Sequence, residues 1–439
     1  MSQLDAAKSG FLLCIGICVF IFSVMYMKYS VSKDPSEQKF VPELVECGFY
    51  PDELCSALFE GKSAAPGIAN YCQEALAPLS IKGPSSLQNS VNCSKFINEQ
   101  HFITSPLSDE EANFPLAYII TIHKELHMFV KLIRAIYAPQ NVYCVHVDEK
   151  SPSTYKNSVQ NLVGCFRNIF LASKRENVVY AGFSRLQADI NCMKDLLDSQ
   201  RKWFYVINLC GQDYPLKTNR EIIAYLKSKW KGRNVTPGVV QPEHMKHRTL
   251  VSYKEFVNVG VSYVYPTSKK KNPPPHNITL YFGTAYYMLT REFVNFILTD
   301  QRATDLLEWS KDTYSPDEHY WITLNRLPDA PGATPDAQWE GNIRAIKWKE
   351  HEGTGHDGCK GHYVRDICIY GLGDLKWIIE TPHIFANKFE PIKYPLVTEC
   401  LERRFRLKVL QQTEVPVQPH WHQTKHSHFN MKLDAGRGW

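Results

Sequence analysis

Strand-like and helix-like segments alternate through the middle of the chain, and this alternation constrains the fold more than any other feature. The segments 116–123, 141–148 and 203–210 are short continuous apolar runs, which are typical of buried strands. Residues 124–138 and 184–199 lie between them and space their apolar side chains as an amphipathic helix does. Strands that alternate with helices predict an α/β domain with a mostly parallel sheet flanked by helices.

Polar side chains follow the carboxyl ends of the expected strands. In a parallel sheet these ends share one edge, which is where α/β folds bind ligands. The residues at this edge are His123, Lys124, Asp148, Glu149, Lys150, Gln212 and Asp213. The sequence contains no P-loop, no dinucleotide-binding glycine motif and no G-x-S-x-G elbow, so those phosphate and hydrolase sites are excluded.

An uncharged apolar stretch occupies residues 10–27, between Lys8 and Lys28. Its length is at the lower limit for a helix that spans a bilayer. The alternative is a cleaved signal peptide, but no small-residue cleavage site follows the stretch. We therefore expect a cytoplasmic tail at 1–9 and an uncleaved transmembrane signal-anchor at 10–27.

Cysteines and glycosylation motifs give the orientation of the remaining chain. Eleven of the 13 cysteines lie beyond the apolar stretch, which favours an oxidising compartment, and their odd number implies at least one free thiol. Sequons begin at Asn92, Asn277 and Asn234, the last weakened by the nearby Pro237. We expect a single-pass type II membrane protein whose C-terminal domain is a lumenal glycoprotein.

Composition divides the lumenal part into three. Residues 28–105 are rich in Cys, Ser and Pro and are expected to form a disulfide-linked stem, followed by a domain at 106–405 and a C-terminal tail at 406–439. The net charge of +5 includes no dense Lys/Arg block, so nucleic acid is not expected as a partner.

Two local patterns in the C-terminal half each allow two interpretations. His351, His356, Cys359, His362 and Cys368 could bind zinc, but cysteine spacing and compartment favour a short-loop disulfide. Ser315-Pro-Asp-Glu318 has the form of a helix capping box. Glu318 could instead be a carboxylate that accepts a proton at a helix N-terminus, although the pattern alone favours capping.

Several long segments together resemble one enzyme family. AYIITIHKE, RAIYAPQNVYCVHVDEK, SRLQADINCM, INLCGQDYPLKTNREI, WSKDTYSPDEHYW and FANKFEP occur in the order of the core-2/I-branching β-1,6-N-acetylglucosaminyltransferases, glycosyltransferase family 14. The resemblance covers about residues 93–405. It implies a GT-A-like fold and a Golgi enzyme that transfers GlcNAc from UDP-GlcNAc, with inversion, in protein glycosylation. The acceptor would be the 6-hydroxyl of galactose or GalNAc in an O-glycan or poly-lactosamine on a glycoprotein.

The resemblance also assigns residues. Glu318 matches the catalytic base, and Arg365 and Lys388 match cations that replace a metal at the donor diphosphate. No metal is then needed, in agreement with a lone Asp148 where nucleotide-sugar enzymes commonly have Asp-x-Asp. Trp348 matches an acceptor-side aromatic. The expected uridine and ribose contacts are Thr121, Ile122, His123, Asp148, Glu149, Lys150 and Tyr180.

The cysteine pairing implied by the resemblance is Cys93–Cys165, Cys144–Cys192 and Cys359–Cys368, with Cys210 free and Cys400 joined to Cys47, Cys55 or Cys72.

One departure from the family pattern concerns the acceptor. Core-2 enzymes place Glu, Lys and Arg contacts where this chain reads NVTPGVVQPEHMKHR, with Thr236 in place of the Glu. This departure concerns acceptor specificity and leaves the donor residues matched. A separate alternative, of another class, is an inactive or weakly active Golgi lectin-like or scaffold protein that keeps the fold. A second copy of the chain is a further candidate partner.

Overall fold

The computed structural model describes residues 51–76, 87, 91–258 and 260–417. The expected cytoplasmic tail, the signal-anchor at 10–27 and Cys47 lie outside these residues. Within the described part of the chain, no helix is both long and apolar enough to cross a bilayer.

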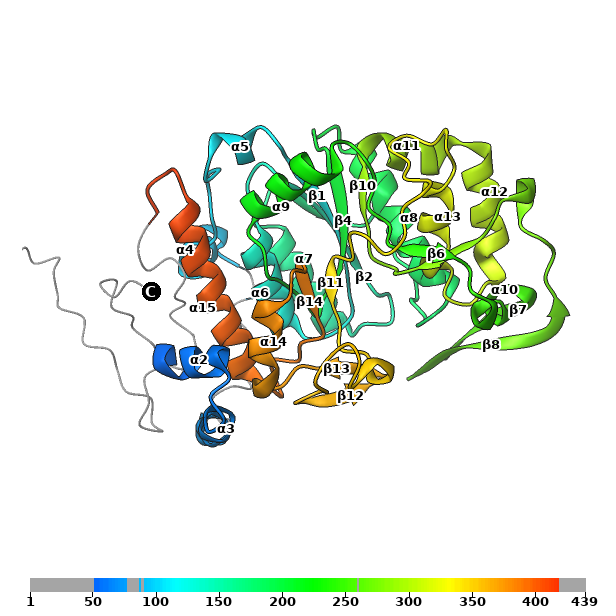
Figure 1. Cartoon of the computed structure of the whole chain (residues 1–439). Coiled ribbons are helices and arrows are strands. Elements are labelled where there is room, and N and C mark those ends of the chain that lie inside the picture. Colours follow the sequence, from blue (N-terminus) through cyan, green and yellow to red (C-terminus); the bar gives the residue numbers. More distant parts are fainter. Residues whose placement is uncertain (1–50, 77–86, 88–90, 259, 418–439) are drawn as a thin grey trace, which may run out of the picture. The chain divides into compact units, whose positions relative to one another are not determined.

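A five-stranded sheet forms the centre of the domain (Figure 1). Its strands, in spatial order, are β10 (Met288–Thr290), β4 (Tyr205–Cys210), β1 (Leu116–Ile122), β2 (Val142–Val147) and β3 (Ile169–Leu171). The four strands β4, β1, β2 and β3 are parallel, and β10 runs antiparallel to β4. The predicted α/β fold with a mostly parallel sheet is confirmed.

Helices pack on both faces of this sheet because β1 and β2 are buried along their whole length. One face carries α6 (Leu126–Ile136), α7 (Ser153–Val163) and α9 (Asn219–Tyr225); the other carries α8 (Phe183–Asp198), α11 (Arg291–Thr299), α12 (Gln301–Trp309) and α13 (Tyr320–Asn325). Alternate residues of β1 serve the two cores: Tyr118 and Ile120 face α6, while Ala117 and Ile119 face α8.

Shorter strand groups surround the carboxyl edge of the sheet. They are β11 (Arg344–Ala345) with β14 (Phe385–Asn387) and β5 (Asp213–Pro215), the hairpins β7 (Val251–Asn258) with β8 (Val261–Lys270) and β12 (His362–Val364) with β13 (Ile367–Ile369), and the pair β6 (Gly238–Val240) with β9 (Tyr281–Gly283). They correspond to the loop-rich C-terminal half of the sequence and carry much of the candidate site.

Segments from the expected stem and tail are part of the folded unit. Helix α2 (Pro51–Glu60) is joined to α15 (Pro395–Gln412) by the Cys55–Cys400 disulfide. Phe96 of α4 (Cys93–Glu99) belongs to the α6-side core. The boundary expected at residue 405 falls inside α15, because buried side chains such as Arg406 continue its packed face.

The structure contains Cys93–Cys165, Cys144–Cys192 and Cys359–Cys368, the same pairs that the resemblance implies. Cys400 pairs with Cys55, one of the three stem cysteines that the resemblance left open. Among the described cysteines, Cys210 alone is free, and burial raises the pKa of its thiol to about 11.

The structure contradicts Asn234 as a glycosylation site. Its side chain is fully buried: Nδ2 donates to Oδ1 of Asn325 at 3.0 Å and to the carbonyl of Pro331 at 2.8 Å, and Oδ1 accepts from the N–H of Thr290 at 2.9 Å. A glycan on this nitrogen would break those bonds. Asn92 and Asn277 are exposed.

We predict that Asn234→Ala lowers the free energy of unfolding by about 2–3 kcal/mol, because buried partners on three segments lose their hydrogen bonds. Asn295→Ala is the matched control and is expected to be near neutral, because this side chain is exposed on helix α11. Thermal unfolding of both variants checks this, and mass mapping of secreted protein should find no glycan on Asn234. A glycan at that position would contradict the prediction.

Candidate active site

The carboxyl ends of β1 and β2 bring the predicted donor contacts together. The N–H of Asp148 donates to the carbonyl of Ile122 at 2.9 Å, and the hydroxyl of Ser151 donates to the carbonyl of His123 at 3.0 Å. The side chain of His123 is exposed at this edge, whereas that of Ile122 is fully buried in the core. Ile122 can therefore offer a ligand only its backbone.

Asp148 is already neutralised by a side chain from its own turn. Nζ of Lys150 lies 2.8 Å from Oδ2 of Asp148 and 2.5 Å from the carbonyl of Val178. Glu149 is similarly engaged, with ion pairs of 2.9 Å to Lys156 and to Arg175. The hydroxyl of Thr121 is buried and has no hydrogen-bond partner among the described residues.

Arg365 is presented by the two-residue turn between β12 and β13. Arg365 and Asp366 have φ of 51° and 60°, the pattern of a type I′ turn, which costs about 1 kcal/mol for each non-glycine residue. The Cys359–Cys368 disulfide fixes the base of this hairpin. The guanidinium of Arg365 lies 4.5 Å from the ring centre of Tyr180, which is 51% exposed. The predicted donor contacts Arg365 and Tyr180 are thus in direct contact.

Lys388 follows β14 and approaches the same edge from the other side. Burial lowers the pKa of its ammonium, and the neighbouring cations Arg365 and Lys124 lower it further. Partial desolvation of the exposed imidazole lowers the pKa of His123, and the charge of Lys388 lowers it further. Two cations from separate segments therefore converge beside the ends of β1 and β2, where an anion would stabilise both.

Glu318 ends a single 3-10 turn, Pro316–Glu318, and the capping box predicted there is absent. Ser315 has φ of 45°, a left-handed conformation, and its side chain makes no capping hydrogen bond. Its N–H instead donates to the carbonyl of Ala181 at 2.8 Å. This bond ties the turn of Glu318 to the loop that carries Tyr180, so the expected base and a donor contact are held side by side.

The carboxylate of Glu318 accepts a hydrogen bond from the guanidinium of Arg248. Burial raises the pKa of Glu318 to about 7, Arg248 lowers it, and the neighbouring Asp317 raises it. The side chain is still 26% exposed, so a substrate can reach it. A carboxylate that titrates near neutral pH and faces solvent suits a general base.

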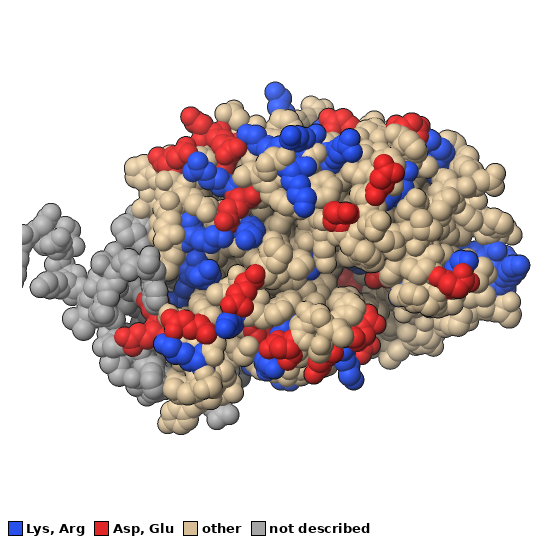
Figure 2. Space-filling view, viewed as in Figure 1, with Lys and Arg blue, Asp and Glu red and all other residues tan. Residues whose placement is uncertain are grey.

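Sequence reasoning did not identify Arg248 as part of this site. It lies 70 residues before Glu318, and its guanidinium is flanked by the rings of Phe282 and Tyr314 at 5.1 and 5.2 Å. Only the basic character of PEHMKHR marked this segment. Figure 2 shows a hollow between the part of the domain that carries the β7–β8 hairpin and the part that carries the β12–β13 hairpin. It is called the hollow below.

The zinc interpretation of residues 351–368 is excluded, because Cys359 and Cys368 form a disulfide. The imidazole of His356 bonds to the carbonyl of Trp348 at 2.7 Å. Trp348 pairs with Ile367 of β13 and is half-buried, so it lies next to the hairpin that carries Arg365. In the described part of the chain, the only group with metal-ligand geometry consists of these two cysteines and Asp374.

Thr236, which stands where core-2 enzymes place a glutamate, does not face the hollow. It is 4% exposed, and its hydroxyl accepts hydrogen bonds from Asn325 at 2.8 Å and from Arg326 at 3.1 Å. This position is structural here.

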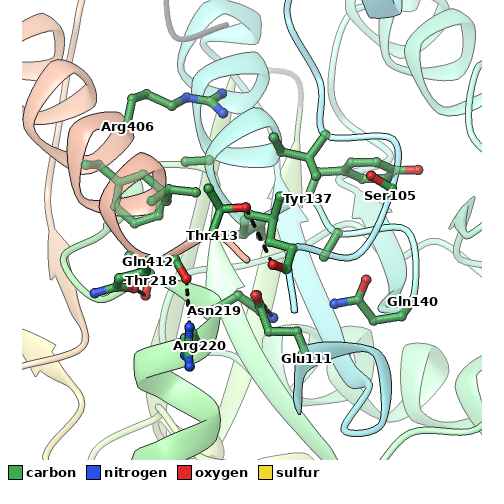
Figure 3. Close-up of a pocket in the computed structure, with 17 residues that line it drawn as sticks. Ser105, Glu111, Tyr137, Gln140, Thr218, Asn219, Arg220, Arg406, Gln412 and Thr413 are labelled. Atoms are coloured by element: carbon green, nitrogen blue, oxygen red, sulfur yellow. Dashed lines mark hydrogen bonds between the residues drawn. The ribbon is translucent and has the colours of Figure 1, made fainter. Parts of the chain in front are cut away.

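A separate pocket lies at the far end of α6, between the start of α9 and the end of α15 (Figure 3). Its polar groups bond to one another: Arg220 donates to the carbonyl of Gln412 at 2.7 Å, and Asn219 donates to Glu111 at 2.7 Å. None of the predicted site residues lines it. We therefore place the candidate active site at the sheet edge and not in this pocket.

The chain matches known proteins over most of its length. The protein-family model "Branch: Core-2/I-Branching enzyme" matches residues 116–379. A human "Probable beta-1,3-galactosyl-O-glycosyl-glycoprotein beta-1,6-N-acetylglucosaminyltransferase 7" is 61% identical over 434 residues, covering 99% of this chain and all of the relative. A human "N-acetyllactosaminide beta-1,6-N-acetylglucosaminyl-transferase" is 54% identical over 370 residues, covering 84% of this chain and 88% of the relative.

Fold, site and matches together define a glycosyltransferase domain. The chain belongs to the core-2/I-branching enzyme family. Within that family, the segments MSQLDAAKSG and ECGFYPDELCSALFEGK resemble the seventh member, and the 61% identity to a relative with that number agrees.

We predict that Arg248→Gln raises the pKa of Glu318 further above its ordinary value, because the cation that favours the ionised carboxylate is removed. A larger fraction of Glu318 is then protonated at neutral pH. Carbon-13 NMR of the labelled carboxyl checks the direction of the shift. An unchanged or lower pKa would show that Arg248 does not stabilise the carboxylate in solution.

Proposed function

We propose that this protein transfers GlcNAc from UDP-GlcNAc to the 6-hydroxyl of galactose or GalNAc, in an O-glycan or poly-lactosamine chain on a glycoprotein. The observation that carries the proposal is the placement of Glu318 beside the Tyr180–Arg365 pair, with the Ser315–Ala181 hydrogen bond holding base and cation on one edge. The printed names of the relatives describe the same reaction class. GT-A-like is the fold subclass that we propose.

In the proposed mechanism, Glu318 takes the proton of the acceptor 6-hydroxyl. The freed oxygen forms a bond to the anomeric carbon as the bond from that carbon to the terminal phosphate oxygen breaks, and the electron pair leaves with UDP. Attack from the face opposite UDP inverts the anomeric centre. Near-neutral titration lets Glu318 accept the proton at the operating pH and pass it to water afterwards.

Arg365 and Lys388 are proposed to stabilise the negative charge that develops on UDP, in place of a divalent metal. Charge-assisted hydrogen bonds from protein cations can perform this task. The engagement of Asp148 by Lys150 supports the idea, since a metal would compete with an ammonium 2.8 Å away. Trp348 is proposed as an acceptor-side aromatic.

The topology remains part of the proposal: a Golgi membrane protein with a signal-anchor at 10–27 and a lumenal catalytic domain. The four disulfides of the described residues support an oxidising compartment. Exposed Asn92 and Asn277 fit glycan attachment. A homodimer is a candidate assembly.

We predict that Glu318→Gln lowers kcat by about 10²- to 10⁴-fold, because the amide cannot take the acceptor proton. UDP binding, measured by calorimetry, should persist. Glu350→Gln is the matched control, since the Glu350 side chain is 75% exposed on the surface. Full activity in purified Glu318→Gln would overturn the assigned base.

The same assay decides between an enzyme and a lectin-like or scaffold protein. A lectin-like protein would bind glycans and show no transfer to any acceptor in the wild type. An acceptor panel that contains core-1, core-3 and poly-lactosamine glycans also identifies the acceptor. Both classes need testing, because one matching relative is named for an O-glycosyl-glycoprotein acceptor and another for an N-acetyllactosaminide.

We also predict that EDTA leaves the initial rate of transfer unchanged. Separately, Arg365→Ala is expected to weaken UDP binding roughly tenfold, because a charge-assisted contact is lost. Lys311→Ala is the control, because this lysine is 54% exposed and pairs with Glu308 outside the site. A rate that falls with EDTA and returns with Mn²⁺ would contradict the metal-free mechanism.

A further inference from the structure

The β7–β8 hairpin is a two-stranded sheet that pairs with no other strand of the described chain. Directly opposed pairs include Phe256 with Tyr263 and Lys254 with Tyr265. Because opposed residues point to the same face of a sheet, the hairpin has two faces of different composition.

The inner face attaches the hairpin to the domain. The carboxylate of Glu255 accepts from the N–H of Ser184 at 2.7 Å, at the start of α8. The ring of Tyr253 lies 5.2 Å from that of Tyr314, and the hydroxyl of Ser252 donates to Asp312 at 2.6 Å. These contacts hold the strands in a fixed position.

The outer face carries an aromatic strip, defined here as Phe256, Tyr263 and Tyr265. Their exposures are 38%, 48% and 40%, and consecutive ring centres are 5.0 and 6.1 Å apart. Val261, which opposes Asn258 on the same face at the end of the hairpin, is 56% exposed. An exposed apolar strip of this kind marks an interaction surface.

The hairpin that carries the strip adjoins the candidate active site through its inner face and the residues before it. Arg248, which binds Glu318, lies three residues before the start of β7. Tyr253 packs on Tyr314, four residues before Glu318. In the view of Figure 1, the β7–β8 hairpin lies along the same lower side of the domain as the β12–β13 hairpin that carries Arg365.

We propose that the aromatic strip binds an extended Ser/Thr/Pro-rich polypeptide, the carrier of the acceptor glycan, while the sugar lies at Glu318. The proposal rests on the proposed function and deepens it. The printed name of the 61% identical relative describes the acceptor as an O-glycosyl-glycoprotein, so a polypeptide continues from the sugar.

The chemistry of the strip fits such a segment. Densely O-glycosylated chains are rich in Ser, Thr and Pro, and such sequences favour the polyproline II conformation. Two residues of that helix advance about 6 Å, close to the spacing of the strip's rings. Aromatic-lined surfaces bind proline-rich segments without depending on backbone pairing, and tyrosine adds a hydroxyl for polar contacts.

The test compares one glycan in two forms, as a simple aryl glycoside and on a Ser/Thr/Pro-rich glycopeptide, with full-length wild type and the triple variant Phe256→Ser/Tyr263→Ser/Tyr265→Ser. The variant should raise the KM for the glycopeptide about tenfold and leave the KM and kcat for the glycoside unchanged. The unglycosylated peptide should inhibit glycopeptide transfer by the wild type only. Tyr71→Ser is the matched control, since Tyr71 is 66% exposed on α3 (Ala65–Leu76).

Three outcomes would overturn the proposal. The variant could retain the wild-type KM for the glycopeptide, or lose activity toward both acceptors equally. It could also convert a dimer to a monomer in light scattering with no change in KM, which would make the strip a self-association surface. Absence of transfer to every acceptor in the wild type would instead reject the proposed function, so the two failures are distinguishable.

Discussion

The pairing of Glu318 with Arg248 is the interaction on which the rest of the candidate site depends. A buried carboxylate without a cation stays protonated at neutral pH, whereas one held too strongly by a cation is a weak base. Burial and Asp317 raise the pKa of Glu318 and Arg248 lowers it, so the group titrates at about 7. This balance persists only while the turn stays against Arg248, which is why the contacts of Ser315 and Tyr314 matter to the chemistry.

Unfavourable backbone conformations gather around this edge. Ala181, Ser315, Arg365 and Asp366 all have positive φ, although none is glycine. Such residues persist only where surrounding contacts over-determine them, and here those contacts are the Ser315–Ala181 hydrogen bond and the disulfide at the base of the β12–β13 hairpin. The domain thus uses the stability of its sheet and helices to hold three loops in one arrangement.

The sheet was predictable from sequence because its strands are buried on both faces and read as continuous apolar runs, and the polar residues after those runs do meet at one edge. The capping box predicted at residues 315–318 was wrong, because the letters S-P-D-E do not reveal the left-handed conformation of Ser315. Asn234 failed for a similar reason, since a sequon carries no information on burial. Arg248 was missed because its partner lies 70 residues away, and only the fold joins the two segments.

The acceptor side and the donor side of the candidate site differ in how their residues are held. The proposed donor contacts come from strand ends and one fixed hairpin, where substitution would disturb the sheet edge itself. On the acceptor side, Thr236 has become part of a buried hydrogen-bond network with Asn325 and Arg326, so this position cannot read a sugar as a glutamate would. Under the proposed function, recognition of the sugar then falls to groups such as Arg248 and Trp348, while the aromatic strip contacts the carrier polypeptide. A shared donor site with an altered acceptor side is the arrangement expected when one reaction serves acceptors that differ between relatives.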